Sequence, residues 1–317
     1  MKNTGKEKKF VSIVVYLHNV EKYIKVFLDT VLSACEENFQ EFELVCVDDG
    51  CTDGTVCTLK EYLEENKPQA MVNIIHMSFF HGLESAMNAG RDLAIGDFVF
   101  EFDDVFVDYE PAMLMKTYER LMEGYDIVAA RSKGKMRLTS RFFYALYNST
   151  SRSRGKIGPE TFRVISRRAI NRIKSMGQYI PYRKAVYMNC GLKTDTIEYR
   201  SSDETARIKN KVVPKERTSL ALDSFIYFTN VLERLSMALC GGFLVLSVGM
   251  GIYLIIDAFT ANKPVEGWLS TMGFLSVGFF GVFALLTIIL KYLSVILNLI
   301  FKQQRYLIAD IEKVVKD

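Results

Sequence analysis

Residues 47–55 read VDDGCTDGT, and they follow the apolar run FELVCV at residues 42–47. The run has the length and the β-branched content of a buried strand, and the Asp and Thr residues after the glycine favour the start of a helix. Two adjacent carboxylates, Asp48 and Asp49, therefore stand where a strand ends. Ligands of open parallel sheets bind beyond the carboxyl ends of the strands, so this turn is the first candidate for a functional site.

Short apolar runs alternate with amphipathic stretches on both sides of this turn. The sequence predicts strands at residues 11–16, 42–47, 72–76 and 98–102, and helices at residues 20–36, 55–66, 82–94 and 111–124. Such alternation is typical of parallel βαβ units, in which helices cover both faces of the sheet. The predicted fold class is therefore α/β, with functional residues gathered where strands end.

The composition excludes several classes of protein. The 317 residues allow roughly two structural units, and 40 Lys and Arg against 37 Asp and Glu leave a net charge of +3, which argues against a general nucleic-acid binder. The six cysteines lack metal-ligand spacing and are expected to be reduced thiols. The charged residues 1–10 carry no signal-peptide pattern, so the N-terminal part is expected to stay in the cytosol.

Positive charge is concentrated in residues 131–174, which contain thirteen Lys and Arg residues and one acidic residue, Glu160. Aromatic residues at positions 142–144 and 147 interleave with them. An amphipathic basic stretch suits a membrane surface, a phosphorylated ligand or RNA, and a solvated basic face is the simpler alternative. RNA is the least favoured partner because it leaves the apolar C-terminal part of the chain without a role.

Two uncharged runs, residues 235–256 and 268–290, predict a transmembrane hairpin. About 22 residues of helix span about 33 Å, and the hydrocarbon core of a bilayer is about 30 Å thick. Basic residues flank the pair on both outer sides, and the connector at residues 257–267 holds only Lys263, so both termini are expected in the cytosol. The predicted domains are a cytosolic domain at 1–225 with a basic juxtamembrane segment, and at 226–317 the hairpin with a cytosolic amphipathic tail.

Four blocks of the sequence resemble the family-2 glycosyltransferases of the GT-A, or nucleotide-diphosphosugar transferase, fold. They are VSIVVYLHNVEKYI at 11–24, VDDGCTDGT at 47–55, FHGLESAMNAG at 80–90 and GDFVFEFDDVFVD at 96–108. Further along, Arg131 after a predicted strand, FRVISRRA at 162–169, PVEGW at 264–268 and QRYLI at 304–308 are similar to the polyprenyl-phosphate group of that family. This group includes enzymes like dolichol-phosphate mannose synthase and bactoprenol glucosyl transferase.

The resemblance implies a Rossmann-like GT-A domain followed by the two-helix hairpin. The implied enzyme is a multi-pass hexosyltransferase of the cytoplasmic membrane, with its catalytic domain in the cytosol. It would transfer a sugar from a UDP- or GDP-sugar to polyprenyl (undecaprenyl) phosphate, with inversion, for cell-envelope glycans. The implied partners are this donor, the lipid acceptor, the membrane and a second copy in a homo-oligomer, with no nucleic acid.

The resemblance also assigns roles to residues of this chain. The implied donor-binding residues are His18, Asn19, Glu21, Asp48, Asp49, Gly82, Asn88 and Asp104. The implied catalytic residues are Asp103, Asp104 and Asp108, of which Asp103 and Asp108 would hold Mg²⁺ or Mn²⁺. The lipid phosphate would be bound by Arg131, Arg163, Arg167 and Arg168. The chain departs from the family where Val105 takes the second acidic position of the DxD motif, which puts the metal in question.

Two alternatives stay open at this stage. The acceptor could be a sugar hydroxyl, but that chemistry needs a carboxylate base, and no family signature for one follows Arg131. The altered DxD motif is also compatible with a non-catalytic relative that binds nucleotide-sugars.

Overall fold

The computed structural model describes most of the N-terminal half of the chain and selected segments of the rest. The described residues are 5–133, 144–145, 148–149, 158–176, 182–201, 238–239, 241–243, 245, 249, 267–301 and 306–314. The chain divides into two compact units. The first contains residues 1–148, 153–221 and 303–317, and the second contains residues 149–152 and 222–302.

The first unit is built on an eight-stranded sheet with the order β7-β5-β6-β4-β1-β2-β3-β8. Its strands are β1 (Val11–Leu17), β2 (Phe42–Asp48), β3 (Met71–Met77), β4 (Phe98–Phe102), β5 (Ile127–Ser132), β6 (Phe162–Ser166), β7 (Thr194–Tyr199) and β8 (Ile308–Val314). The first four strands pair in parallel, as predicted. Strand β6 enters antiparallel between β4 and β5, and β8 lies antiparallel to β3, so the sheet is mixed.

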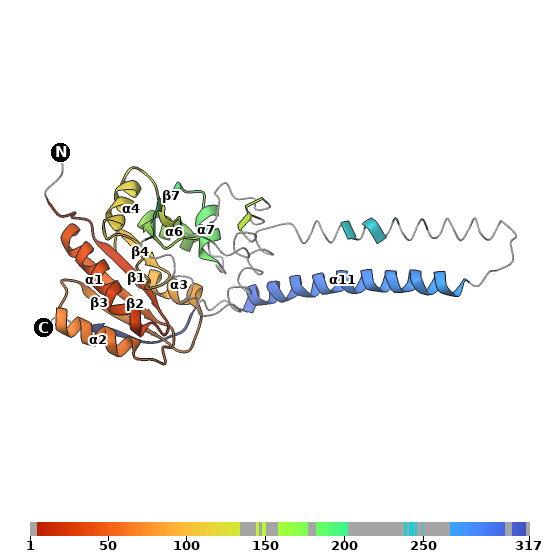
Figure 1. The fold of residues 1–317 in the computed structure, drawn as a ribbon, viewed down its shortest axis with the longest axis horizontal. Coiled ribbons are helices and arrows are strands. Elements are labelled where there is room, and N and C mark those ends of the chain that lie inside the picture. Colours follow the sequence, from red (N-terminus) through yellow and green to blue (C-terminus); the bar gives the residue numbers. More distant parts are fainter. Residues whose placement is uncertain are drawn as a thin grey trace. The chain divides into compact units, whose positions relative to one another are not determined.

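Helices cover both faces of this sheet. They are α1 (Glu21–Asn38), α2 (Thr55–Asn66), α3 (Leu83–Leu93), α4 (Ala112–Met122), α6 (Arg167–Ser175) and α7 (Arg183–Asn189). Alternate residues of β1 point to opposite faces: Ile13 belongs to the core cluster that contains Phe27 of α1, whereas Val14 lies under α3. Figure 1 shows α1 and α2 side by side, with α3 on the other side of the sheet.

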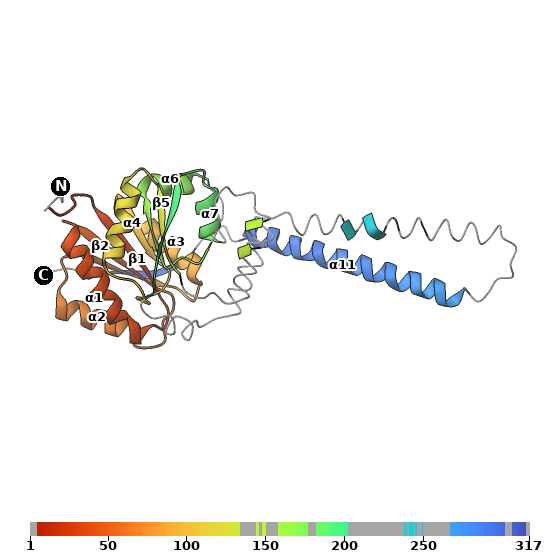
Figure 2. The same cartoon turned by 45° about the horizontal axis from the view of Figure 1, so that its top comes forward.

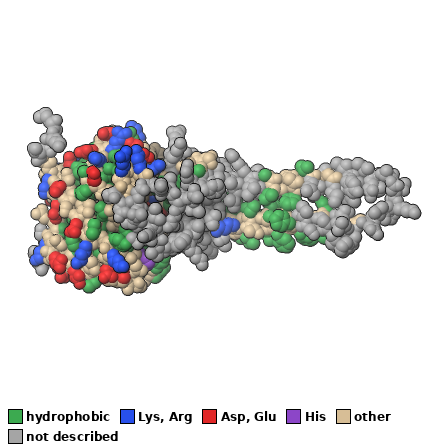
Figure 3. All heavy atoms as spheres, viewed as in Figure 1, with side chains coloured by type: hydrophobic (Ala, Val, Ile, Leu, Met, Phe, Trp, Pro, Cys, Tyr) green, Lys and Arg blue, Asp and Glu red, His purple; other side chains and the backbone are tan. Residues whose placement is uncertain are grey.

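Helix α3 packs very closely on the sheet because it carries a glycine at the contact. A Cβ atom at Gly90 would lie 2.5 Å from a methyl carbon of Val14 and 2.6 Å from a methyl carbon of Val47. The turned view in Figure 2 shows the same stacking of α3 against the strands. Lys and Arg side chains mingle with Asp and Glu over the visible described surface of the first unit (Figure 3).

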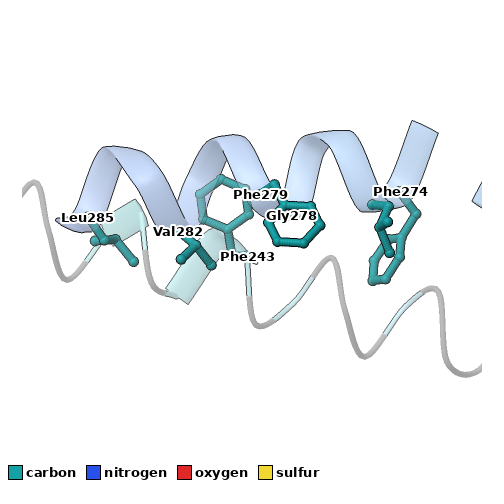
Figure 4. Close-up of a pocket in the computed structure, with 7 residues that line it drawn as sticks. Phe243, Phe274, Gly278, Phe279, Val282 and Leu285 are labelled. Atoms are coloured by element: carbon teal, nitrogen blue, oxygen red, sulfur yellow. The ribbon is translucent and has the colours of Figure 1, made fainter. Parts of the chain in front are cut away.

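The second unit contains α11 (Trp268–Phe301), which includes the second predicted membrane segment. The first predicted segment, residues 235–256, lies largely outside the described residues. Phe243 packs against Gly281 of α11 and helps to line an apolar pocket of about 330 Å³ together with Phe274 and Val282 (Figure 4). Within the part of the chain that the structure describes, no helix reaches the length and apolarity of a membrane span.

Candidate functional site

The carboxyl ends of four neighbouring parallel strands lie along one edge of the sheet. Strands β4, β1, β2 and β3 are adjacent and point the same way. His18 directly follows β1, Asp48 ends β2, Asp49 follows it, and Asp103 follows β4. The structure therefore brings the predicted donor-binding and catalytic carboxylates to one edge, where α/β sheets bind ligands.

Asp49 is a buried anchor of this edge. Its side chain accepts hydrogen bonds from the hydroxyl of Tyr16 at 3.0 Å and from the backbone N–H groups of His81 at 2.7 Å and Gly82 at 2.8 Å. Gly82 has a φ of +82°, a backbone conformation that favours glycine. Asp49 therefore holds the loop after β3 in place, and its carboxylate is fully buried.

Asp48 is the more accessible of the two adjacent carboxylates, with 13% of its side chain exposed. One carboxylate oxygen accepts from the backbone N–H of Cys51 at 2.9 Å. The other lies 2.9 Å from Nδ1 of His76. Both contacts fix the orientation of the carboxylate at the edge of the sheet.

Asn19 and Glu21 hold the turn that follows Asp49. Asn19 adopts a φ of +52°, and its side-chain oxygen accepts from the backbone N–H groups of Thr52 at 2.8 Å and Asp53 at 3.3 Å. A carboxylate oxygen of Glu21 accepts from the backbone N–H of Gly54 at 3.1 Å. These two predicted donor ligands thus stabilise the backbone that carries the carboxylates.

An aromatic pair lies beside the two carboxylates. The ring of His18 lies 4.6 Å from the ring of Phe80, and His18 donates through Nδ1 to the backbone oxygen of Asp49 at 2.8 Å. Phe80 is 39% exposed, and its backbone lies next to Gly50. Sequence reasoning did not single out Phe80, although it begins the FHGLESAMNAG block and lies three residues after the end of β3.

Asp103 is bound by two buried arginines. Its two carboxylate oxygens accept from Arg163 and Arg183, each at 2.7 Å. Both guanidiniums also donate to the buried carboxylate of Glu101 at 2.9 Å. Nζ of Lys184 lies 3.9 Å from Asp103. Sequence reasoning missed Arg183 because no family motif covers the segment that contains it.

The ion pairs extend into a larger buried charged network. Glu84 accepts from Nε of Arg183 at 2.8 Å, and Glu160 accepts from Nε of Arg163 at 3.0 Å. We call the following nine residues the buried charged network: Glu84, Asn88, Arg91, Glu101, Asp103, Glu160, Arg163, Arg183 and Tyr187.

Asn88 belongs to this network. Its side-chain oxygen accepts from Arg91 at 2.6 Å, and Arg91 also donates to the hydroxyl of Tyr187 at 3.0 Å. Tyr187 in turn donates to Glu101 at 2.8 Å. This predicted donor ligand of α3 is 4% exposed and supports the network.

The network keeps the carboxyl group of Asp103 and the guanidinium of Arg163 ionised. Burial raises the pKa of the Asp103 carboxyl, but the positive charges of Arg163, Arg183 and Lys184 outweigh burial and hold that pKa well below its usual range. Burial lowers the pKa of Arg163, and its carboxylate partners more than restore it. Four carboxylates face three guanidiniums with Lys184 alongside, so the buried charges nearly cancel.

The two predicted metal ligands have protein partners of their own. Asp108 is 3% exposed and accepts from the hydroxyls of Tyr199 at 2.6 Å and Ser201 at 3.2 Å. A cation at Asp103 would meet two guanidiniums that already bind the same carboxylate. Val105, which takes the second acidic position of the DxD motif, is buried in the core and offers no ligand. Among the described residues no group of three His, Cys, Asp or Glu side chains is arranged to hold a metal ion. This arrangement does not fit a divalent cation.

Asp104 lies on the same edge. It is partly exposed, and one carboxylate oxygen accepts from the backbone N–H of Phe106 at 3.2 Å. Asp103 is also partly exposed, but both of its carboxylate oxygens accept from arginines, and Asp108 is buried.

The four predicted phosphate-binding arginines do not come together. Arg167 donates to the backbone oxygens of Ala94 and Gly96, before the amino end of β4, and Arg168 donates with two nitrogens to Asp126, before β5. These contacts place both arginines at the opposite edge of the sheet from Asp103.

The other two arginines lie nearer the carboxyl edge. Arg163 is committed to the buried charged network. Arg131 is the penultimate residue of β5, with 37% of its side chain exposed, and lies 3.7 Å from Glu198. Much of the basic stretch that contains Arg131 lies outside the described residues.

Comparison with known proteins gives the class of this α/β protein. Residues 12–176 match Glycosyl transferase family 2, and the chain belongs to this family. It is 24% identical over 313 residues to an uncharacterized glycosyltransferase of Synechocystis sp., covering 95% of each chain. It is 29% identical over 274 residues to the bactoprenol glucosyl transferase of Shigella phage SfV, covering 83% of this chain and 86% of the relative.

A solved structure supports the fold. Glucosyl-3-phosphoglycerate synthase from Mycobacterium tuberculosis, crystallised with Mn²⁺, uridine diphosphate and phosphoglyceric acid, has a TM-score of 0.50 to this chain. It is 13% identical and covers 68% of this chain and 75% of its own. The predicted GT-A-like α/β fold is confirmed, with a mixed sheet.

Proposed function

We propose that this family-2 glycosyltransferase transfers a sugar from a nucleotide-diphosphosugar to polyprenyl phosphate. The observation that carries the proposal is the shared edge of the sheet, where Asp48 and the His18–Phe80 aromatic pair lie on the same side as Asp103 and Asp104. The relatives named bactoprenol glucosyl transferase support the choice of a lipid phosphate as acceptor.

The nucleoside of the donor would bind at the end of β2. Asp48 offers a carboxylate to hydroxyl or N–H groups, and the half-exposed ring of Phe80 beside His18 offers a surface on which a base can stack. Asp49, Asn19, Glu21 and Gly82 would set the shape of the surrounding loops. Asp104 would orient the sugar because it is partly exposed at the same edge.

The acceptor chemistry requires no base. A polyprenyl phosphate is already ionised, so its oxygen attacks the anomeric carbon directly while the bond from that carbon to the nucleoside diphosphate breaks, with inversion. The departing diphosphate carries negative charge that needs cations nearby. Lys184 is our candidate for this role because its Nζ lies 3.9 Å from Asp103, whereas Arg163 and Arg183 donate hydrogen bonds to that carboxylate at 2.7 Å. Arg131, being partly exposed, is our candidate for the lipid phosphate.

We further propose that the chain works at the cytosolic face of a membrane. The absence of charged residues from positions 235–256 and 268–290 supports a hairpin within residues 226–317, attached to a cytosolic domain at residues 1–225. A hairpin would bring the lipid phosphate close to the domain and restrict its motion, which favours reaction through positioning.

Transfer of label tests the proposal. The full chain, purified in detergent, is incubated with undecaprenyl phosphate and a panel of labelled UDP- and GDP-sugars, and label extracted into organic solvent is counted. We expect label from one donor, and at least a tenfold loss in Asp104→Asn. Lys25→Gln is the control, because this residue of α1 is exposed and is not among the proposed donor or lipid contacts.

The same assay separates the alternatives. A parallel arm with Mn²⁺ or chelator tests the predicted metal at Asp103 and Asp108, and equal transfer in both would refute it. Label on a soluble sugar but not on lipid would move the acceptor to a hydroxyl. Donor binding by calorimetry without transfer would favour the non-catalytic relative, which Val105 in the DxD motif and the arginine-bound Asp103 support.

A further inference from the structure

Strand β8 is the outermost strand of the sheet on the side of β3, which lies beside the strand that carries Asp48. It pairs antiparallel with β3, from Val72 opposite Val314 to Met77 opposite Ile308 (Figure 1, blue). Because β3 runs towards the carboxyl edge, the start of β8 and the residues just before it lie where the loop after β3 begins. Ser78 of that loop donates its backbone N–H to the backbone oxygen of Leu307 at 3.1 Å.

One histidine links β8 to Asp48. Nδ1 of His76 lies 2.9 Å from a carboxylate oxygen of Asp48, and Nε2 lies 3.4 Å from a carboxylate oxygen of Glu312 on β8. Carboxylates only accept hydrogen bonds, so the imidazole can serve both when each nitrogen carries a proton. Lys60 pairs with the same oxygen of Glu312 at 2.7 Å and holds the acid in place.

A second histidine links the same segment to Asp49. The backbone N–H of Leu307 donates to Nε2 of His81 at 3.1 Å, and Nδ1 of His81 lies 2.5 Å from the backbone oxygen of Phe79. This pattern requires a neutral ring with its proton on Nδ1. The backbone N–H of the same histidine donates to Asp49 at 2.7 Å.

We propose that residues 306–314 are a positioning element for the nucleoside site, acting on Asp48 through His76 and on the loop that carries Phe80 through His81. The inference rests on the proposed function, because it assumes that the donor binds at this edge. Tyr306 adds an anchor outside the site, since its hydroxyl donates to Asp92 of α3 at 2.9 Å. The donor site is thus complete only when this C-terminal segment is docked.

Glu312→Gln tests the first link in the full-length protein. The variant keeps the shape of the side chain and removes the charge that His76 contacts. We expect the dissociation constant of the nucleotide-sugar to rise by about tenfold, the size expected from losing one charged hydrogen bond, and KM to rise with little change in kcat. Lys313→Gln is the matched control, because the neighbouring side chain on the same strand is exposed.

Two further measurements distinguish positioning from a general loss of stability. In a His76→Gln background, Glu312→Gln should cause no additional loss of affinity, because both changes break one link. Amide hydrogen exchange of the protein without ligand should rise at residues 49–54 in Glu312→Gln and stay unchanged in α4. If the wild type binds the donor, and Glu312→Gln changes neither the donor affinity nor the exchange at residues 49–54, the inference is overturned and the proposed function stands. A wild-type protein that binds no nucleotide-sugar would overturn the proposed function, and donor positioning with it.

Discussion

Arg183 donates to three carboxylates at once: Glu84, Glu101 and Asp103. Its side chain is fully buried, so its removal leaves uncompensated negative charge away from water. We expect Arg183→Met to lower the free energy of unfolding by about 3–5 kcal/mol. Urea denaturation followed by circular dichroism measures the change. Lys133→Met, at an exposed surface pair, should cost less than about 1 kcal/mol, and equal effects of the two changes would contradict a special role for the network.

The low pKa of Asp103 makes a prediction about acid. A carboxyl whose pKa is lower in the folded than in the unfolded protein stabilises the fold above its unfolded value, near 3.9, and that stability is lost as the pH falls through the folded value. The thermal unfolding midpoint of the wild type should therefore drop more steeply than that of Asp103→Asn as the pH falls below about 4. Parallel curves for the wild type and Asp103→Asn would refute the assignment.

At the scale of single elements, the contact between α3 and the sheet leaves no room for a methyl group at Gly90. We expect Gly90→Ala to destabilise the protein by about 1–3 kcal/mol, because the two valine methyl groups beneath it belong to stiff, buried side chains. Val14→Ala should rescue part of the loss, as a thermal double-mutant cycle would show. Gly5→Ala, with no atom within 4 Å of its added methyl group, should be neutral.

The elements that sequence reasoning predicted are those with strong local patterns. Strands β1 to β4 and the helices between them follow their apolar periods, because each buries a face against its immediate neighbours in the chain. Strand β8 was not predicted as a strand: it reads IADIEKV, is mostly exposed, and its partner strand is far away in the chain. Local pattern cannot reveal a pairing of that kind.

The candidate site was predictable only in part, for a related reason. Motifs located the carboxylates Asp48, Asp49 and Asp103 at strand ends, and the structure places them on one edge. Motifs did not reveal the second arginine that neutralises Asp103, since Arg183 lies 80 residues from it in the chain. The resemblance to the DxD motif suggested a metal at Asp103 and Asp108, and the structure pairs Asp103 with two guanidinium groups.

At the scale of the whole molecule, residues 222–302 belong to a different compact unit from the sheet. Because the first unit includes residues 303–317, replacing residues 222–302 with a Gly-Ser linker should preserve its sheet. We expect this variant to bind the nucleotide-sugar like the wild type and to lose transfer to undecaprenyl phosphate in vesicles. Calorimetry and organic extraction measure the two activities separately, and retained transfer would argue against the proposed hairpin.

A truncation after residue 221 provides the contrasting case. It removes β8 as well as the second unit, so donor affinity should fall by about tenfold or more relative to the linker variant. Equal affinity in the two shortened proteins would show that the docked C-terminal segment does nothing for the nucleoside site.

The antiparallel pairing of β8 with β3 also has a consequence for how the protein is made. His76 and Glu312 are separated by 236 residues, which a ribosome adding about 5–20 residues per second needs on the order of ten to fifty seconds to synthesise. Throughout that interval the nascent chain has a β3 edge with unpaired N–H and C=O groups, the kind of edge at which chains aggregate. Slower synthesis through residues 222–302 would prolong this exposure, so the yield of soluble protein should depend on translation speed in a segment remote from the sheet.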